Sequence, residues 1–189
     1  MPIALVRAPV GGQITGRSKY CVTCGDGDSC FGSGGNHATC KGYSSPVDIA
    51  GTGTLTLFVN YPTVKSIVTL IGLECCCDAC DDQYERTITV KLYGQPGGVC
   101  YIGAVMYGHV INPLVTHNTT YNLTSSSWDL GSVPAGTCTA CAFACYTGPH
   151  CHMERSGGST SAPCCCLNAT RGLTTIYEWN FMCPSAPTK

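Results

Sequence analysis

Charged side chains are scarce in this sequence. Aspartate, glutamate, lysine and arginine make up 11% of the 189 residues, against about 25% in an ordinary soluble domain. Ten basic residues stand against eleven acidic ones, for a formal net charge of −1, and they form no basic run. The chain therefore lacks the positive surface that nucleic-acid binding requires, and we expect no nucleic-acid partner. Few ionic groups would lose water if its surface were buried against neighbouring subunits.

Long apolar stretches are also missing. No segment approaches the roughly 18 uninterrupted apolar residues of a membrane-spanning helix, and the best candidate, Ser66–Leu73, has the length of a β-strand. The opening Met-Pro-Ile-Ala-Leu-Val is followed at once by Arg7, Pro9 and two glycines. A conventional export signal needs a longer apolar core. We therefore expect no membrane span and no conventional signal peptide.

The sequence motifs of common enzyme classes are absent. A G-x-S-x-G nucleophile motif, a phosphate-binding loop and a dinucleotide-binding fingerprint do not occur. Haem attachment would need a C-x-x-C-H motif, which is also absent. We expect that the protein is not an enzyme and has no resident cofactor.

Alternating residues predict an all-β domain. The clearest strand is Arg86–Tyr93, where Ile88, Val90 and Leu92 alternate with polar residues and should face the core. The other predicted strands are Thr54–Asn60, Val64–Leu73, Val99–Tyr107, Tyr121–Ser126 and Thr174–Phe181. The Gly- and Pro-containing turn at 94–98 makes the strands before and after it a hairpin. No window gives an amphipathic helix, so we predict a single β-sandwich or jelly-roll-like domain of six or seven strands.

Two long cysteine-rich regions, residues 21–48 and 138–166, interrupt the strand pattern. Their Gly, Ser and Pro content predicts loops, which need cross-links to be ordered at this length. Residues 1–20 contain Pro9 and several glycines that break any helical period. We therefore expect an extended N-terminal arm over residues 1–20 and a cysteine-rich β domain over residues 21–189.

Cysteine is the dominant signal, with 17 residues in the chain. This density is typical of a disulfide-stapled chain or of a multi-site metal protein. All are disulfide candidates: Cys21, Cys24, Cys30, Cys40, Cys75, Cys76, Cys77, Cys80, Cys100, Cys138, Cys141, Cys145, Cys151, Cys164, Cys165, Cys166 and Cys183. Adjacent cysteines rarely bond to each other, so the Cys-Cys-Cys blocks at 75–77 and 164–166 should bond to distant partners. The number is odd, so at least one cysteine is free, metal-bound or paired between chains.

Zinc is the alternative to disulfides. Its candidate ligands are Cys138, Cys141, Cys145 and Cys151, with His150 and His152 on either side of the last. Four such ligands would complete a tetrahedral zinc site, but the second C-x-x-C knuckle of a zinc ribbon is absent. His37, His109 and His117 are interpreted as surface or loop histidines.

Two further features concern the surface. Asn118-Thr-Thr, Asn122-Leu-Thr and Asn168-Ala-Thr are N-glycosylation sequons, which matter only in a eukaryotic secretory pathway. Aromatic residues that would form a sugar-stacking surface are Tyr101, Tyr107, Tyr121, Trp128, Tyr177 and Trp179. Such residues more often cover a core or fill subunit contacts.

Low charge, a β core and dense cysteines favour a non-enzymatic structural component of an extracellular assembly. The class that fits best is a virion protein (capsid decoration, neck or tail), because a chain without an export signal would be oxidised after its cell lyses. Its partners would be other subunits of the same assembly, reached through the N-terminal arm. The alternatives are a secreted or surface-displayed module that binds carbohydrate, and an intracellular interaction protein stabilised by zinc.

Overall fold

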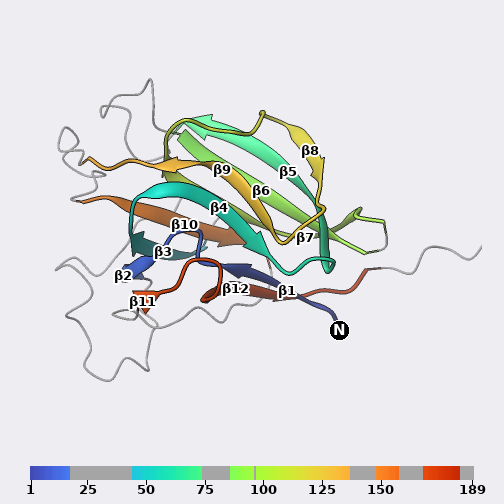
Figure 1. Cartoon of the computed structure of the whole chain (residues 1–189). Helices are drawn as coiled ribbons and strands as arrows, with labels where there is room; N and C mark the ends of the chain where they lie inside the picture. The colour runs from blue at the N-terminus through green and yellow to red at the C-terminus, as the bar shows by residue number, and fades with distance from the viewer. Residues whose placement is uncertain (18–43, 74–85, 96, 137–147, 158–167, 184–189) are drawn as a thin grey trace, which may run out of the picture.

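The described part of the chain consists of β-strands joined by turns (Figure 1). The computed structural model describes residues 1–17, 44–73, 86–95, 97–136, 148–157 and 168–183, which contain no helix. The strands are β1 (Ile3–Arg7), β2 (Gly12–Arg17), β3 (Ser44–Ala50), β4 (Gly53–Val59), β5 (Val64–Leu73), β6 (Arg86–Gly94), β7 (Cys100–Val110), β8 (Thr119–Asn122), β9 (Ser127–Val133), β10 (His150–Ser156), β11 (Asn168–Ala169) and β12 (Thr175–Asn180). The predicted all-β fold is confirmed. In these ranges there is no helix long and apolar enough to cross a membrane.

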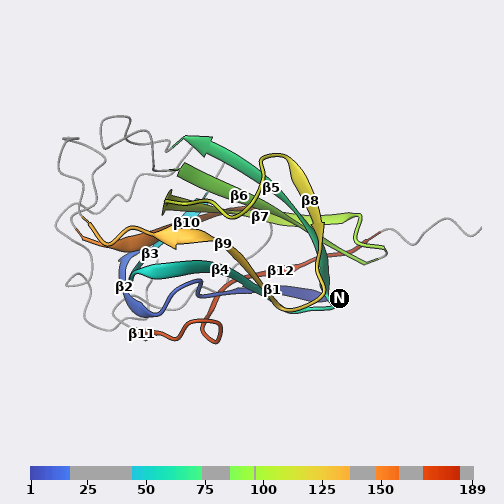
Figure 2. The same cartoon turned by 45° about the horizontal axis from the view of Figure 1, so that its top comes forward.

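The strands form two antiparallel sheets that pack face to face as a sandwich (Figure 1, Figure 2). The smaller sheet has the order β12-β1-β4-β9, and the larger has the order β11-β2-β3-β10-β7-β6-β5-β8. The chain passes twice from an edge of the larger sheet to an edge of the smaller one, from β8 to β9 and from β11 to β12. A connection between the sheets therefore runs at each open side of the sandwich.

The core lies between the sheets and is filled by alternate residues of their strands. Ile88, Val90 and Leu92 of β6 are fully buried, while Thr89 and Lys91 between them are partly exposed. The smaller sheet contributes Ala4 and Val6 from β1, Leu55, Leu57 and Val59 from β4, and Tyr177 and Trp179 from β12. The predicted inward face of β6 is confirmed, and a slip of one residue would turn that face outward.

The predicted strands are confirmed in whole or in part, and six further ones in the described residues were not predicted: β1, β2, β3, β9, β10 and β11. β4, β5, β6, β7 and β12 overlap the predicted ranges, and β8 is shorter than predicted. The prediction of loops is wrong for residues 44–48 and 150–156, which are strands. Consecutive residues of β10 are buried, from Cys151 to Glu154, so this strand lacks the alternation that reveals a half-exposed strand.

The N-terminal segment is extended, as expected, and it is also built into both sheets. β1 lies between β12 and β4, and β2 lies between β11 and β3. Val6 pairs with Tyr177 on one side and with Val59 on the other. Residues 3–7 and 12–17 therefore belong to the sandwich instead of standing apart from it as an arm.

Truncation of one buried side chain tests the register of β6. Leu92→Ala is expected to lower the free energy of unfolding by about 2–5 kcal/mol, because it removes a fully buried side chain and leaves a cavity. Lys91→Ala, at the next position on the opposite face, is expected to change it by about 0.5 kcal/mol or less. Urea denaturation followed by tryptophan fluorescence measures both, and equal effects would contradict the register.

Candidate functional site

Three of the seventeen cysteines lie in the described residues: Cys100, Cys151 and Cys183. The other candidates lie outside them: Cys21, Cys24, Cys30, Cys40, Cys75, Cys76, Cys77, Cys80, Cys138, Cys141, Cys145, Cys164, Cys165 and Cys166. The long-range bonding of the two Cys-Cys-Cys blocks and the cysteine part of the alternative zinc site therefore remain predictions.

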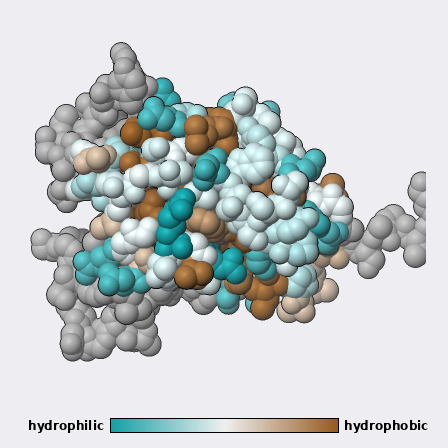
Figure 3. Space-filling model, in the orientation of Figure 1, coloured by the Kyte–Doolittle hydropathy of each residue, from teal (hydrophilic) through white to brown (hydrophobic). Residues whose placement is uncertain are grey.

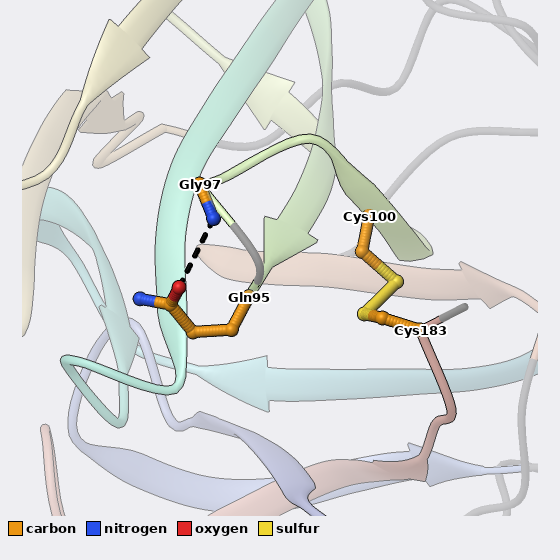
Figure 4. Close-up of a disulfide and its surroundings, with 4 residues drawn as sticks. All are labelled: Gln95, Gly97, Cys100 and Cys183. Carbon is orange, nitrogen blue, oxygen red and sulfur yellow. Dashed lines mark hydrogen bonds between the residues drawn. A yellow bond between two sulfur atoms is a disulfide. The ribbon is translucent and has the colours of Figure 1, made fainter. Parts of the chain in front are cut away.

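Cys100 and Cys183 form a disulfide that joins the two sheets at one end of the sandwich (Figure 4). Cys100 begins β7 of the larger sheet, and Cys183 follows β12 of the smaller one. The two Cα atoms are 5.6 Å apart, and the residues are 83 positions apart in sequence. In the turn before Cys100, the Gly97 N–H donates a hydrogen bond to Gln95 Oε1 at 3.0 Å. The disulfide thus links two of the cysteines that were predicted as disulfide candidates.

Several exposed hydrophobic residues belong to chain segments that end on the same side of the sandwich as this disulfide, and these residues are termed here the apolar end. Its members, between 38% and 81% exposed, are Met1, Ile3, Tyr61, Val99, Tyr101 and Met182. Figure 1 and Figure 2 place the N-terminus, the β6–β7 turn and the end of β12 together here. On the face shown in Figure 3, hydrophobic side chains form small groups separated by hydrophilic ones. Clustered apolar side chains mark an interaction site, whereas scattered ones do not.

Hydrogen bonds hold the apolar end together from distant parts of the chain. Asn60, in the β4–β5 turn, accepts a hydrogen bond from the Leu5 N–H at 2.8 Å. Its Nδ2 donates to the Ile3 carbonyl at 2.9 Å. The Phe181 N–H donates to the Pro2 carbonyl at 3.3 Å. The first residues of the chain are thus fixed beside the β4–β5 turn and beside the segment that leads to Cys183.

Lys65 borders the aromatic part of the apolar end. Lys65 Nζ lies 3.3 Å from Tyr61 Oη and 4.5 Å from the centre of the Tyr61 ring. A cation held over a ring at an exposed site contributes about 0.5–1 kcal/mol. The rings of Tyr93 and Tyr101 meet edge to face, with centroids 5.6 Å apart. The side chains of the apolar end are thioether, aliphatic and phenol groups, and Met1 adds the N-terminal ammonium group.

A second feature is a buried group of three histidines and two carboxylates, termed here the histidine cluster. Its members are Asp48 from β3, His109 from β7, and His150, His152 and Glu154 from β10. The three residues of β10 are two positions apart, so the strand directs them to one face. His152 Nδ1 lies 2.9 Å from Asp48 Oδ1, and His152 Nε2 lies 2.8 Å from Glu154 Oε1. Both ring nitrogens of His152 are therefore engaged with a carboxylate.

The carboxylates keep His152 protonated. Burial alone would lower its pKa, but hydrogen bonds to Asp48 and Glu154, together with their negative charges, raise the pKa to about 9. The pKa of His150 is instead lowered by burial, which outweighs the attraction of Asp48. The arrangement is thus one imidazolium between two carboxylates, with a neutral imidazole beside them.

Further contacts of the cluster connect β10 to its other neighbour, β7. His150 Nδ1 lies 2.8 Å from the Gly148 carbonyl, and its ring meets that of His109 at a centroid distance of 4.7 Å. His109 has a φ of 56° and sits where the β6–β7 register shifts, as in a β-bulge. The cluster therefore spans three adjacent strands, β3, β10 and β7.

The structure separates the histidine and cysteine candidates of β10. Cys151 is buried in the core between the sheets, whereas His150 and His152 point to the opposite face. Among the described residues, no group of three or more His, Cys, Asp or Glu is arranged to hold a metal ion.

His117 is exposed, as predicted, and its Nδ1 accepts a hydrogen bond from the Ile71 N–H at 3.0 Å. His109 is buried, so its prediction as a surface histidine is wrong, and His37 lies outside the described residues.

Asp48, His109 and Glu154 were not identified from the sequence as members of a site. The i, i+2, i+4 spacing of His150, His152 and Glu154 was an available signal, but it is informative only if the segment is a strand. Asp48 is 104 positions from His152. No local pattern connects residues at that separation.

The aromatic residues divide between the core and the surface. Tyr107, Tyr177 and Trp179 are fully buried. Tyr121 and Trp128 are half-buried and contact each other, with ring centroids 4.9 Å apart. Of the six proposed for sugar stacking, Tyr101 alone is exposed, and it belongs to the apolar end.

Comparison of the chain with protein-family models, curated protein sequences and solved structures finds no match.

The histidine cluster predicts that the chain loses stability as the pH rises. The pKa of His152 is about 9 in the folded chain and about 6.5 in an unfolded one. Its contribution is therefore fully present below pH 6.5 and is lost as the pH rises through 9, a change of about 3 kcal/mol in the free energy of unfolding. Denaturation at stepped pH measures this slope. His152→Gln should remove most of this pH dependence, whereas His117→Gln should leave it unchanged. A pH dependence that survives His152→Gln would show that it does not arise from His152.

The disulfide predicts coupled effects of its two cysteines. Cys100→Ser is expected to lower the free energy of unfolding by about 2–4 kcal/mol, because the long loop is no longer closed in the unfolded chain. Cys183→Ser should cost the same, and the double variant should cost no more than either single variant. Thermal unfolding of the three variants measures this, and additive losses would show that the cysteines act independently.

Proposed function

We propose that this chain is a non-enzymatic structural subunit of an extracellular assembly and that it contacts a second copy of itself through the apolar end. The observation that carries the proposal is that six exposed hydrophobic residues belong to segments that meet at the end of the sandwich where Cys100 and Cys183 form their disulfide. Removing apolar surface from water contributes about 25 cal/mol per Å². In the single chain these side chains remain in water, so a contact that covers them is favourable.

A second copy suits this surface on electrostatic grounds. The chain carries ten basic and eleven acidic residues, so two copies scarcely repel each other. The charge at the border, Lys65, is held against Tyr61. A contact that uses the same surface on both copies must be self-complementary, and Met1 and Met182 have the flexible side chains that adapt to such a surface.

The disulfide supports an extracellular setting. Disulfides persist in oxidising surroundings and are rare in the cytosol. We propose a virion, with this chain as a capsid decoration, neck or tail protein, because a virion protein is oxidised once its cell lyses. The bond also fixes β7 and the segment after β12 beneath the apolar end, so the surface is held in one shape before it meets a partner. A preordered surface loses less entropy on association.

The contact proposed here is a surface contact and not the donation of an N-terminal strand. β1 already pairs on both sides, with β12 and with β4. Its backbone groups would have to leave those partners to pair with a neighbouring subunit. Ile3 and Met1 instead contribute exposed side chains at the start of the strand.

The two alternative functions have weaker support. Sugar stacking would rely on aromatic residues of which Tyr107, Tyr177 and Trp179 are buried. Zinc ligation by His152 would require it to leave both Asp48 and Glu154. We therefore propose neither.

Two matched substitutions test the proposed contact. Val99 and Leu173 are 75% and 73% exposed, and only Val99 belongs to the apolar end. Val99→Lys should weaken self-association at least tenfold, because burial of a valine contributes about 1.5–3 kcal/mol and 1.4 kcal/mol is a factor of ten. Leu173→Lys, in the β11–β12 turn, should leave self-association unchanged.

Size-exclusion chromatography with light scattering, over a range of concentrations, measures the association. A wild-type chain that stays monomeric at every concentration would refute the proposal. Equal weakening by both substitutions would show that the contact does not depend on the apolar end.

A further inference from the structure

The three glycosylation sequons lie on the two edge strands of the larger sheet. Asn118 immediately precedes β8, and Asn122 is its last residue. Asn168 is the first residue of β11. In the described part of the chain, β8 pairs only with β5, and β11 pairs only with β2. The motif therefore marks both outer edges of one sheet.

In two of the sequons, the backbone turns the acceptor outward and the middle residue inward. Asn122 and Thr124 are exposed, whereas Leu123 between them is buried in the core. The sequon at 168–170 repeats this pattern around the buried Ala169. Glycosylation requires a hydroxyl two positions after the asparagine, and a bulky glycan requires a surface position. Both requirements are met because every second residue faces the same side.

Asn60 provides a contrast within the same fold. It is half-buried, its two side-chain groups hydrogen-bond to Leu5 and Ile3, and Pro62 stands where a sequon needs a hydroxyl. Asn122 and Asn168 are exposed, and no hydrogen bond of their side chains appears among the described residues. Both asparagines are therefore at the surface, where a bulky glycan can be attached.

The disulfide is compatible with two routes, because it can form in the oxidising lumen of the eukaryotic secretory pathway or after the cell lyses. N-linked glycans are added only in that lumen, so use of the sequons would place the chain on the first route and oxidation after lysis would not be needed.

We propose that Asn122 and Asn168 are N-glycosylation sites, which place one glycan on each edge of the larger sheet. The amide nitrogen bonds to the anomeric carbon of an oligosaccharide carried on a lipid diphosphate. The bond from that carbon to the phosphate oxygen breaks, and the lipid diphosphate and one amide proton leave. Unprotected edge strands pair with other chains, and a glycan on each edge prevents such pairing. Asn118 would add a further glycan only to the edge that Asn122 already covers.

Site mapping in secreted protein tests the proposal. The full chain, secreted from cultured eukaryotic cells behind an added leader, is treated with peptide N-glycosidase and analysed by peptide mass spectrometry. Conversion of Asn122 and Asn168 to aspartate is expected. Asn122→Gln and Thr124→Ala should each remove the same glycan, whereas Asn180→Gln, an exposed asparagine outside any sequon, should remove none. Secreted wild-type chain with both sites unmodified would overturn the proposal, whatever the variants do.

The role of the glycans at the edges has a separate readout. In the Val99→Lys background, self-association through the apolar end is already weakened, so association that appears after enzymatic removal of the glycans reports on the edges. Light scattering before and after this treatment is expected to show an increase in mass. An unchanged mass would overturn the protective role of the glycans. It would not affect the mapping of the glycosylation sites or the proposed contact at the apolar end, which are tested separately.

Discussion

The larger sheet depends on β10, because this strand joins its two halves. β11, β2 and β3 lie on one side of it, and β7, β6, β5 and β8 lie on the other. His152 pairs with Asp48 in one ladder and with Gly108 in the other, so both halves are aligned on a strand that is remote from them in sequence. Without β10 the sheet would divide and expose two new edges. The smaller sheet is tied to the same strand, because the Tyr177 hydroxyl of β12 donates to the Met153 carbonyl.

Burial on both faces gives β10 its unusual chemistry. Cys151 and Met153 face the core between the sheets. On the other face Glu154 is fully buried, where an uncompensated carboxylate would be very costly. The proton on His152 serves Glu154 and Asp48 together. The histidine cluster thus neutralises the buried carboxylates and allows a polar strand to lie in the middle of the sheet. Because Asp48 belongs to β3, the pairing of β10 with β3 is coupled to the protonation of His152.

Whether a strand is buried on one face or on both explains which strands can be predicted from the sequence. β6 is buried on one face, so its alternation of Ile88, Val90 and Leu92 with polar residues was sufficient to predict both strand and orientation. β10 has no such alternation, and its histidines were interpreted as ligands together with Cys151 because the three are adjacent in sequence. Once the segment is known to be a strand, adjacency implies opposite faces. Partners across the fold, such as Asp48 for His152 or Cys183 for Cys100, are set by sheet topology, which no local pattern encodes.

The two proposals concern two kinds of surface, the apolar end and the sheet edges, which would lead to different assemblies. Edge strands add to one another without limit, because each added strand presents a new edge. A contact between two apolar ends is self-complementary and closes after two copies. The sequons lie on the edges, at β8 and β11, while the segments that carry the residues of the apolar end meet where Cys100 and Cys183 form their disulfide. If glycans cover the edge strands and the apolar end stays exposed, association would favour a dimer over an open chain of subunits. The Cys100–Cys183 disulfide would hold the two sheets in one relative position while the dimer contact forms.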